Sequence, residues 1–189
     1  MKRCALIFVA AVLCSCGGVA AIRETTDPFT QSVVIEYSRG LLLDYKGQSD
    51  LLSLLGQMPE YGINVRGHVY PKDASRSSTS LIMYYAGPDW FFIQEDGTVQ
   101  LLYNNGSSTT LNGQDRESDT AVVDGEVWCI EKVFVPVSDS VIDSLCNGSV
   151  TLIRLNGRSV YQDLTIPEIT LQRLNDLWAR IRSRQEGGV

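Results

Sequence analysis

Short runs of β-branched and aromatic residues recur along the chain after residue 32, and turn-forming residues separate them. Such runs are typical of β-strands. They predict strands at residues 33–37, 63–70, 80–85, 90–94, 98–103, 126–135, 149–155 and 158–161. Asp96-Gly97, Asn104-Asn105-Gly106 and Asn156-Gly157 lie between neighbouring runs and favour the tight turns of hairpins. We therefore expect an antiparallel meander.

The clearest helix is predicted near the carboxyl end of the chain. Thr165 precedes Glu168 by three residues, the spacing of a capping box, and Pro167 suits a first helical turn. Apolar residues then recur at helical spacing: Ile169, Leu171, Leu174, Leu177, Trp178 and Ile181. The pattern predicts an amphipathic helix that covers one face of the sheet.

Two shorter helices complete the predicted fold. Ser49 and Gly56 enclose a leucine-rich run as N-cap and helix stop. Ser138 is the expected N-cap of the other helix, whose apolar face is Val141, Ile142, Leu145 and Cys146. The fold class is therefore α+β: a mainly antiparallel meander sheet packed against a C-terminal amphipathic helix and one or two short helices.

Two stretches lack a hydrophobic period. Residues 16–29 show no hydrophobic period and contain Pro28 near their end, and we interpret them as a flexible tether. Residues 112–124 are polar and acidic, and we expect an exposed loop there. Residues 30–186 then form a single globular domain, long enough to bury its own core.

The first fifteen residues are typical of an export signal. Lys2 and Arg3 give a positive start, and Cys4–Leu13 contains no charged side chain. About ten apolar residues span roughly 15 Å as a helix, about half of the hydrocarbon core of a bilayer. The segment therefore predicts a cleaved signal peptide over residues 1–15 in preference to a transmembrane helix.

The residues Leu13-Cys14-Ser15-Cys16 resemble the lipobox of bacterial lipoproteins, with an apolar residue at −3 and a small residue at −1 before the modified cysteine. Cys14 at −2 departs from the usual choice. The resemblance implies that Cys16 is acylated, with fatty chains such as palmitate, and that membrane lipid is one partner. Gly17 is not the aspartate associated with inner-membrane retention, which favours the outer membrane and a domain in the periplasm or at the cell surface.

Two other interpretations of this segment stay open. Val19-Ala20-Ala21 also fits a small-residue cleavage site, which releases a soluble protein that begins at Ile22. Alternatively, the apolar stretch is a buried N-terminal strand of a cytosolic protein. We favour the lipid-anchored form.

The net charge of the chain without its signal peptide bears on the class of partner. Removing residues 1–15 takes away Lys2 and Arg3 and no acidic residue, so the formal net charge falls from −6 to −8. Such a surface repels phosphate, and we expect no nucleic-acid partner.

Besides Cys16, the chain after residue 15 has only the cysteines Cys129 and Cys146, which form either one disulfide or two buried free thiols. Their spacing does not resemble a zinc site.

Two further candidate sites consist of polar residues: one histidine and a group of carboxylates. His68 lies in a strand pattern, and no nucleophile motif accompanies it, so an ordinary strand histidine is favoured over a catalytic or metal-binding one. Five carboxylates could offer oxygen ligands to calcium but lack the register of an EF-hand loop, which favours a solvated acidic segment. They are Asp115, Glu117, Asp119, Asp124 and Glu126.

The densest aromatic cluster is Trp90-Phe91-Phe92. In strand-like alternation, Trp90 and Phe92 share one face while Phe91 takes the other. One face is then expected to pack in the core. The other, with Tyr84, Tyr85 or Tyr103, is a candidate recognition surface for protein or glycan.

No catalytic, phosphate-binding or metal-binding motif stands out in this sequence. We therefore expect a non-enzymatic binding or assembly module of the cell envelope, which contacts an envelope protein or the cell wall and uses no metal or small-molecule cofactor. Two alternatives remain. One is an envelope hydrolase that acts through carboxylates or a thiolate without a local motif, and the other is an immunity or exclusion lipoprotein that inhibits an envelope partner.

Overall fold

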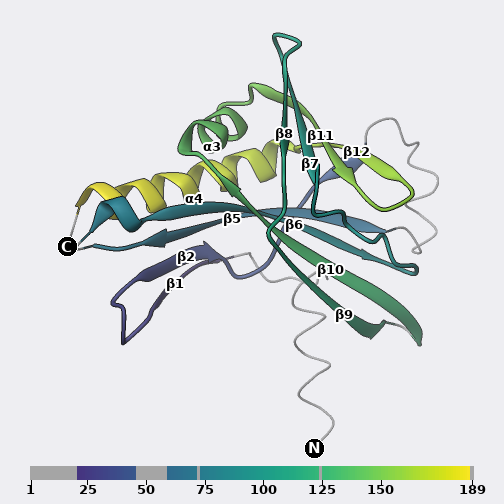
Figure 1. The fold of residues 1–189 in the computed structure, drawn as a ribbon, viewed down its shortest axis with the longest axis horizontal. Coiled ribbons are helices and arrows are strands. Elements are labelled where there is room, and N and C mark those ends of the chain that lie inside the picture. Colours follow the sequence, from purple (N-terminus) through teal and green to yellow (C-terminus); the bar gives the residue numbers. More distant parts are fainter. Residues whose placement is uncertain (1–20, 46–58, 72, 124, 188–189) are drawn as a thin grey trace, which may run out of the picture.

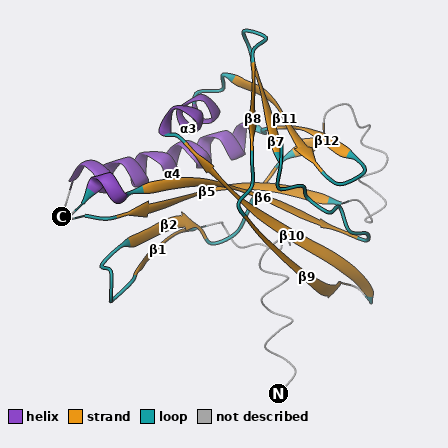
Figure 2. Ribbon diagram, in the orientation of Figure 1, coloured by secondary structure: helices purple, strands orange, loops and turns teal. Residues whose placement is uncertain are grey.

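The computed structural model describes residues 21–45, 59–71, 73–123 and 125–187. The described chain forms two antiparallel sheets, two α-helices and one short 3-10 helix, η1 (Ala74–Arg76) (Figures 1 and 2). This bears out the α+β class and its antiparallel pairing. The single meander becomes two sheets.

The larger sheet has the order β1-β2-β5-β6-β10-β9, and a short strand, β3, also pairs with β5. Its strands are β1 (Ile22–Thr26), β2 (Val33–Tyr37), β3 (Leu41–Leu42), β5 (Glu60–Val69), β6 (Ser78–Gly87), β9 (Asp115–Val123) and β10 (Glu126–Val137). We call this the large sheet. Figure 1 shows how its long strands twist and curl across the molecule.

The smaller sheet has the order β4-β12-β11-β7-β8. Its strands are β4 (Asp44–Tyr45), β7 (Val99–Tyr103), β8 (Ser108–Leu111), β11 (Val150–Asn156) and β12 (Tyr161–Thr165). The turn predicted at residues 104–106 lies between β7 and β8, as expected. Asn156 instead ends β11 and pairs with Tyr161, so residues 157–160 form the connection to β12 and the strand predicted from Arg158 starts only at Tyr161.

The core lies between the two sheets and the helices. Alternate residues of β5, β6 and β10 point to one side of the large sheet, and we call this side the inner face. Ile63, Leu81, Met83, Val133 and Val135 on this face are fully buried.

Helix α4 (Glu168–Gly187) packs on the inner face against β5 and β2 (Figure 1). Its buried residues include Leu174, Leu177, Trp178 and Ile181. At Gly67 a Cβ atom would lie 2.7 Å from Ile181, so glycine is what permits the helix to approach β5 this closely. The predicted amphipathic helix is therefore present, although it begins at Glu168 and Thr165 is the last residue of β12.

Helix α3 (Asp139–Cys146) packs against α4. Ser138 is its N-cap residue by position, and Ile142, Leu145 and Cys146 are buried as predicted. The indole N–H of Trp178 donates to Oδ1 of Asp143 at 2.7 Å, which joins the two helices. The helix expected at residues 49–56 lies outside the described residues. None of the described helices is both long and apolar enough to cross a membrane.

Two segments differ from the sequence-based expectations. Residues 22–26, assigned to the tether, form β1, in which Ile22 pairs with Tyr37 and Thr26 with Val33. Residues 115–123, assigned to an exposed loop, form β9 along β10. Both are edge strands with polar side chains, and such strands show little hydrophobic signal because one row of their backbone groups faces solvent.

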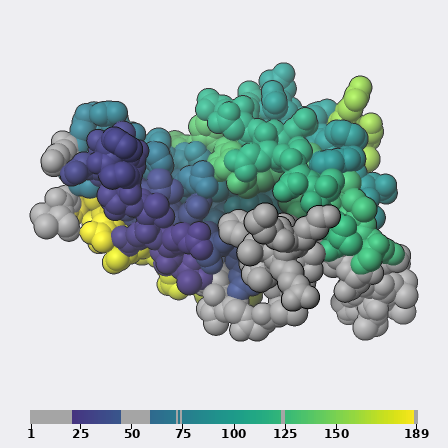
Figure 3. Space-filling model, turned by 90° about the horizontal axis from the view of Figure 1, so that it is seen from below, coloured from purple at the N-terminus to yellow at the C-terminus, as the bar shows by residue number. Residues whose placement is uncertain are grey.

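Figure 3 shows the N-terminal strands β1 and β2, in purple, on the surface at one end of the molecule. The loop between them follows Thr26 and carries Phe29, whose side chain is 94% exposed. The pairing of Val34 with His68 and of His68 with Ser78 places this loop beside the start of β6. The segment Trp90-Phe91-Phe92 instead follows the other end of β6, about 30 Å away along a ten-residue strand.

Candidate functional site

The segment Trp90-Phe91-Phe92-Ile93, which we call the aromatic segment, covers the inner face of the large sheet beyond the end of β6. It was predicted as a strand but is irregular, and one isolated bridge joins Ile93 to Gly157. Its rings divide as the alternation predicted. Phe91 is 8% exposed, whereas Trp90 is 38% and Phe92 45% exposed.

Phe91 anchors the segment in the core. Its ring stacks on Tyr85, with 5.2 Å between centroids, and meets Tyr61 edge-on at 5.7 Å. Tyr61 and Tyr85 are register partners on β5 and β6, so a rigid part of the sheet supports the anchor. The exposed rings of Trp90 and Phe92 lie beside each other, 6.1 Å apart and tilted by 31°. Of the tyrosines proposed to join this surface, Tyr84 and Tyr85 are buried.

Phe92 has a left-handed backbone, with φ of 55°. This conformation costs a residue with a side chain about 1–2 kcal/mol, so surrounding contacts must hold it in place. Backbone strain of this kind is often found where a protein orients a functional side chain.

Glu131 supplies the main contact. It lies on the inner face of β10 and is 1% exposed. The backbone N–H of Phe92 donates to its Oε1 at 2.7 Å, and the N–H of Ile93 donates to its Oε2 at 2.8 Å. One buried carboxylate therefore holds two successive amides through charge-assisted hydrogen bonds.

The carbonyl groups of the same two residues are held from other elements. The carbonyl oxygen of Phe92 accepts from the backbone N–H of Arg158 at 2.9 Å. The carbonyl oxygen of Ile93 accepts from Nη1 of Arg116, on β9, at 3.2 Å. The N–H and C=O groups of Phe92 and Ile93 are thus all bonded, and we call this arrangement the clamp. It fixes the direction of the Phe92 side chain.

Sequence reasoning missed the clamp. Glu131 belongs to the alternating inward series Cys129, Glu131, Val133 and Val135, and the charged residue in an apolar register is the signal that could have found it. Arg116 lies in the stretch assigned to a loop, and Arg158 was assigned to a strand, so nothing connected them to residue 92. Gly157 also contributes, because a Cβ there would lie 2.5 Å from the carbonyl oxygen of Phe91.

A hollow of about 610 Å³ opens beside Phe92. Its walls are Phe92, Ile93, Gln94, Glu95, Asp96, Arg116 and Arg158. The aromatic segment therefore offers an apolar surface and a neighbouring depression lined by both apolar and charged side chains.

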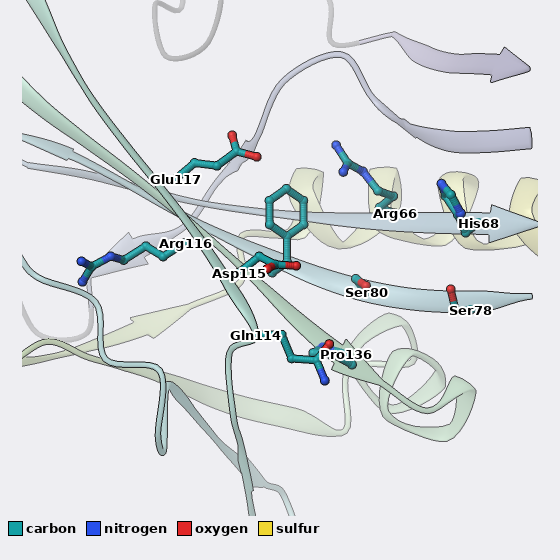
Figure 4. A pocket seen from close by; sticks show the side chains of 10 residues that line it. Arg66, His68, Ser78, Ser80, Gln114, Asp115, Arg116, Glu117 and Pro136 are labelled. Carbon is teal, nitrogen blue, oxygen red and sulfur yellow. The ribbon is translucent and has the colours of Figure 1, made fainter. Parts of the chain in front are cut away.

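A second hollow, of about 570 Å³, lies on the outer face of the large sheet (Figure 4). Its polar walls include His68, Ser78, Ser80 and Asp115. His68 and Ser78 are register partners, but no hydrogen bond joins their side chains in the described part of the chain. The structure therefore brings together residue types found in catalytic triads without the bonded geometry that a triad uses.

Two charged residues that line the outer hollow, Arg66 and Glu117, form ion pairs with residues of neighbouring strands. Arg66 pairs with Glu36 at 2.6 Å, and Lys132 pairs with Glu117 at 2.6 Å. Both cations also lie over the ring of Phe134, whose centroid is 4.7 Å from the Arg66 guanidinium carbon and 4.8 Å from the Lys132 nitrogen. This network ties neighbouring strands together across the outer face.

Four of the candidate calcium ligands lie on the paired strands β9 and β10. Asp115, Glu117 and Asp119 are on β9 and Glu126 is on β10, while Asp124 lies outside the described residues. No group of three or more potential metal ligands comes together among the residues that the structure describes.

Cys129 and Cys146 are free and buried, so the structure has the pair of thiols and not the bridge. Cys129 is on β10, with its Sγ 4.0 Å from the carbonyl oxygen of Pro88, and Cys146 ends α3. Burial raises the pKa of Cys129, and burial with Asp143 nearby raises the pKa of Cys146 to about 12. Both thiols therefore resist ionisation, which disfavours either as a thiolate nucleophile. Cys16 lies outside the described residues.

No family model, curated protein or solved structure matches this chain, and its function is therefore inferred from its own sequence and geometry.

Proposed function

We propose that this chain is a non-enzymatic binding protein of a bacterial cell envelope, anchored to membrane lipid through Cys16, which recognises a protein partner through the exposed rings of Trp90 and Phe92. The observation that carries the binding role is the clamp. Four hydrogen bonds hold the backbone of Phe92 and Ile93, with Phe92 in a strained conformation, and the ring of Phe92 is left at the surface.

A packing role alone does not account for this arrangement. Phe91 already fills the core position, and a smaller polar side chain at residue 92 would satisfy the same backbone bonds. Exposed tryptophan and arginine are enriched among the residues that dominate protein–protein binding energies. A surface that is fixed before binding loses less conformational entropy when the partner arrives.

The anchoring role rests on the resemblance of Leu13–Cys16 to a lipobox and on the apolar leader before it. A single acyl chain gives only marginal membrane binding, whereas two or more hold a protein stably. A multiply acylated Cys16 would therefore keep the domain at the membrane, and the absence of aspartate at residue 17 favours the outer membrane.

Site-specific photo-crosslinking in living cells tests the binding role. We would place benzoylphenylalanine at residue 90 or 92 in the full-length chain and at residue 29 as the control. Phe29 is the better control because its side chain is more exposed than either ring, so unspecific contacts favour it. We expect one discrete protein adduct from residues 90 and 92 and none of that mass from residue 29. The same adducts from all three positions would contradict the proposal.

Mass spectrometry of membrane-extracted protein tests the anchor separately. The wild-type chain should begin at Cys16 and carry the mass of attached acyl chains. Cys16→Ser should lose this mass and leave the membrane fraction. A mature chain that begins at Ile22, or an uncleaved leader without lipid, would contradict the anchoring proposal.

A further inference from the structure

Arg116 and Arg158 bring two guanidinium groups to the hollow beside Phe92. Arg116 is positioned by its own bond to the Ile93 carbonyl oxygen, and Arg158 by its backbone N–H, which donates to the Phe92 carbonyl oxygen. Neither side chain forms an ion pair within the described residues. By contrast, most other cations there pair with carboxylates: Arg66, Lys132, Arg154, Arg180, Arg182 and Arg184.

The same hollow contains the carboxylates of Glu95 and Asp96, and both residues are exposed. Two guanidinium groups and two carboxylates give a formal local charge close to zero. This balance disfavours a dianion such as a phosphate monoester. A single carboxylate adds only one negative charge, and its planar shape matches the two parallel N–H donors of a guanidinium group, so directed hydrogen bonds would hold it.

The apolar wall of the hollow is Phe92, whose ring also borders Trp90. A ligand that fills the hollow therefore meets an aromatic face and a guanidinium group at the same time. Charge-assisted bonds give direction, and the aromatic face adds apolar contact.

We propose that this hollow binds a carboxylate of the partner that lies next to an apolar or aromatic group, with the carboxylate between Arg116 and Arg158 and the apolar group on Phe92. This rests on the proposed binding function and adds the chemistry of the ligand. The carboxylate belongs either to a chain terminus or to an acidic side chain, since both offer the same planar anion.

Three small probes separate these sources. N-acetylphenylalanine carries a terminal carboxylate beside its ring, acetyl-Phe-Glu-amide carries a side-chain carboxylate, and acetyl-phenylalaninamide carries none. Each is titrated into the full-length, isotope-labelled protein in detergent, and the NMR signals of the Phe92 and Ile93 amides and of the arginine side chains are followed. We expect saturable shifts at these signals from at least one carboxylate probe, with the amide probe weaker by about tenfold or more.

Substitution of Arg158 tests the assignment of the cation. Arg158→Gln removes the charge but keeps the backbone N–H that bonds to Phe92, so the clamp is preserved. We expect it to lower the affinity for the carboxylate probe severalfold, toward that of the amide probe, and Arg158→Lys to restore part of the difference. Arg23→Gln, on the exposed surface of β1, is the matched control and should change nothing.

The outcomes distinguish this inference from the proposed function. Equal binding of the carboxylate and amide probes at Phe92 would overturn the carboxylate site while leaving the aromatic surface in place. No saturable binding of any probe up to its solubility limit would also overturn the carboxylate site, and crosslinking at residues 90 and 92 would then decide the proposed function alone. Carboxylate binding that requires Arg158, combined with no crosslinked partner, would support the site and contradict the proposed function.

Discussion

Replacing Glu131 by glutamine perturbs the clamp directly. In the wild-type protein each carboxylate oxygen accepts one backbone N–H, from Phe92 at 2.7 Å and from Ile93 at 2.8 Å. Glutamine keeps one acceptor and directs an NH₂ group at the other N–H. One bond to a charged acceptor is lost, and one buried N–H loses its partner. A hydrogen bond to a charged group contributes about 1.5–3 kcal/mol.

The burial of a charge acts in the opposite direction. Glu131 is 1% exposed, so its carboxylate loses its hydration on folding, and this costs free energy. A neutral amide at the same position has a smaller desolvation cost. Because the two N–H donors already stabilise the carboxylate and the variant leaves one of them unpaired, we expect the lost bond to dominate. The free energy of unfolding should fall by about 2 kcal/mol, which corresponds to a drop in melting temperature of about 4–8 °C for a domain of this size.

The assays are urea unfolding and amide hydrogen exchange. We expect the amides of Phe92 and Ile93 to lose protection more than the amides of β5 do, because the damage is local. Glu117→Gln is the matched control, since it removes an exposed ion pair to Lys132, with an expected cost of about 1 kcal/mol or less. If Glu131→Gln behaved like this control, with unchanged protection at residues 92 and 93, the reasoning about the clamp would be refuted.

Three further predictions concern single substitutions. Phe92→Gly should hold or raise stability by up to about 1 kcal/mol in urea unfolding, because glycine suits a φ of 55°, yet it should abolish partner crosslinking from residue 90. Gly67→Ala should lower the free energy of unfolding by about 1–3 kcal/mol, since its Cβ meets Ile181 at 2.7 Å. Burial raises the pKa of Glu60 above 4.5, so its contribution to stability is present below pH 4.5 and is lost as pH rises. The melting temperature of Glu60→Gln relative to wild type should therefore rise with pH, and a difference that stays constant with pH would contradict this prediction.

The sequence predicted the elements whose pattern is local. Helix α3 and the buried face of α4 follow from apolar residues at helical spacing, and the side on which Phe91 lies follows from alternation with its neighbours. The residues at which these elements begin and end were predicted less accurately. Thr165 has the spacing of a capping residue but ends β12, because pairing in the small sheet extends to this position and the helix starts after Pro167.

The edge strands were beyond local reasoning for a physical reason. β9 carries Asp115, Glu117 and Asp119, and these charged residues led to the prediction of an exposed loop. Charged side chains also protect an edge strand from pairing with other molecules, so they are equally compatible with a strand. Its strand conformation comes from pairing with β10, which the composition of residues 112–124 does not encode.

The aromatic residues of the candidate site could be predicted from the sequence, but the residues that hold them could not. The aromatic segment stood out by composition, but the residues that hold it come from β9, β10 and the loop after β11. The contact between Glu131 and Phe92 joins residues 39 positions apart, and it depends on the tertiary arrangement of the sheets. A periodic pattern shows which residues share a face, but it does not show which loop will meet them.

The most direct test of the account is the yield of the protein adduct from benzoylphenylalanine at residue 90, compared between the wild-type background and Glu131→Gln at equal expression. We expect a strong loss of adduct in the Glu131→Gln background, although the crosslinking residue itself is unchanged. An undiminished adduct in a variant whose Phe92 and Ile93 amides have lost protection would show that recognition does not depend on the clamp, and would contradict the account.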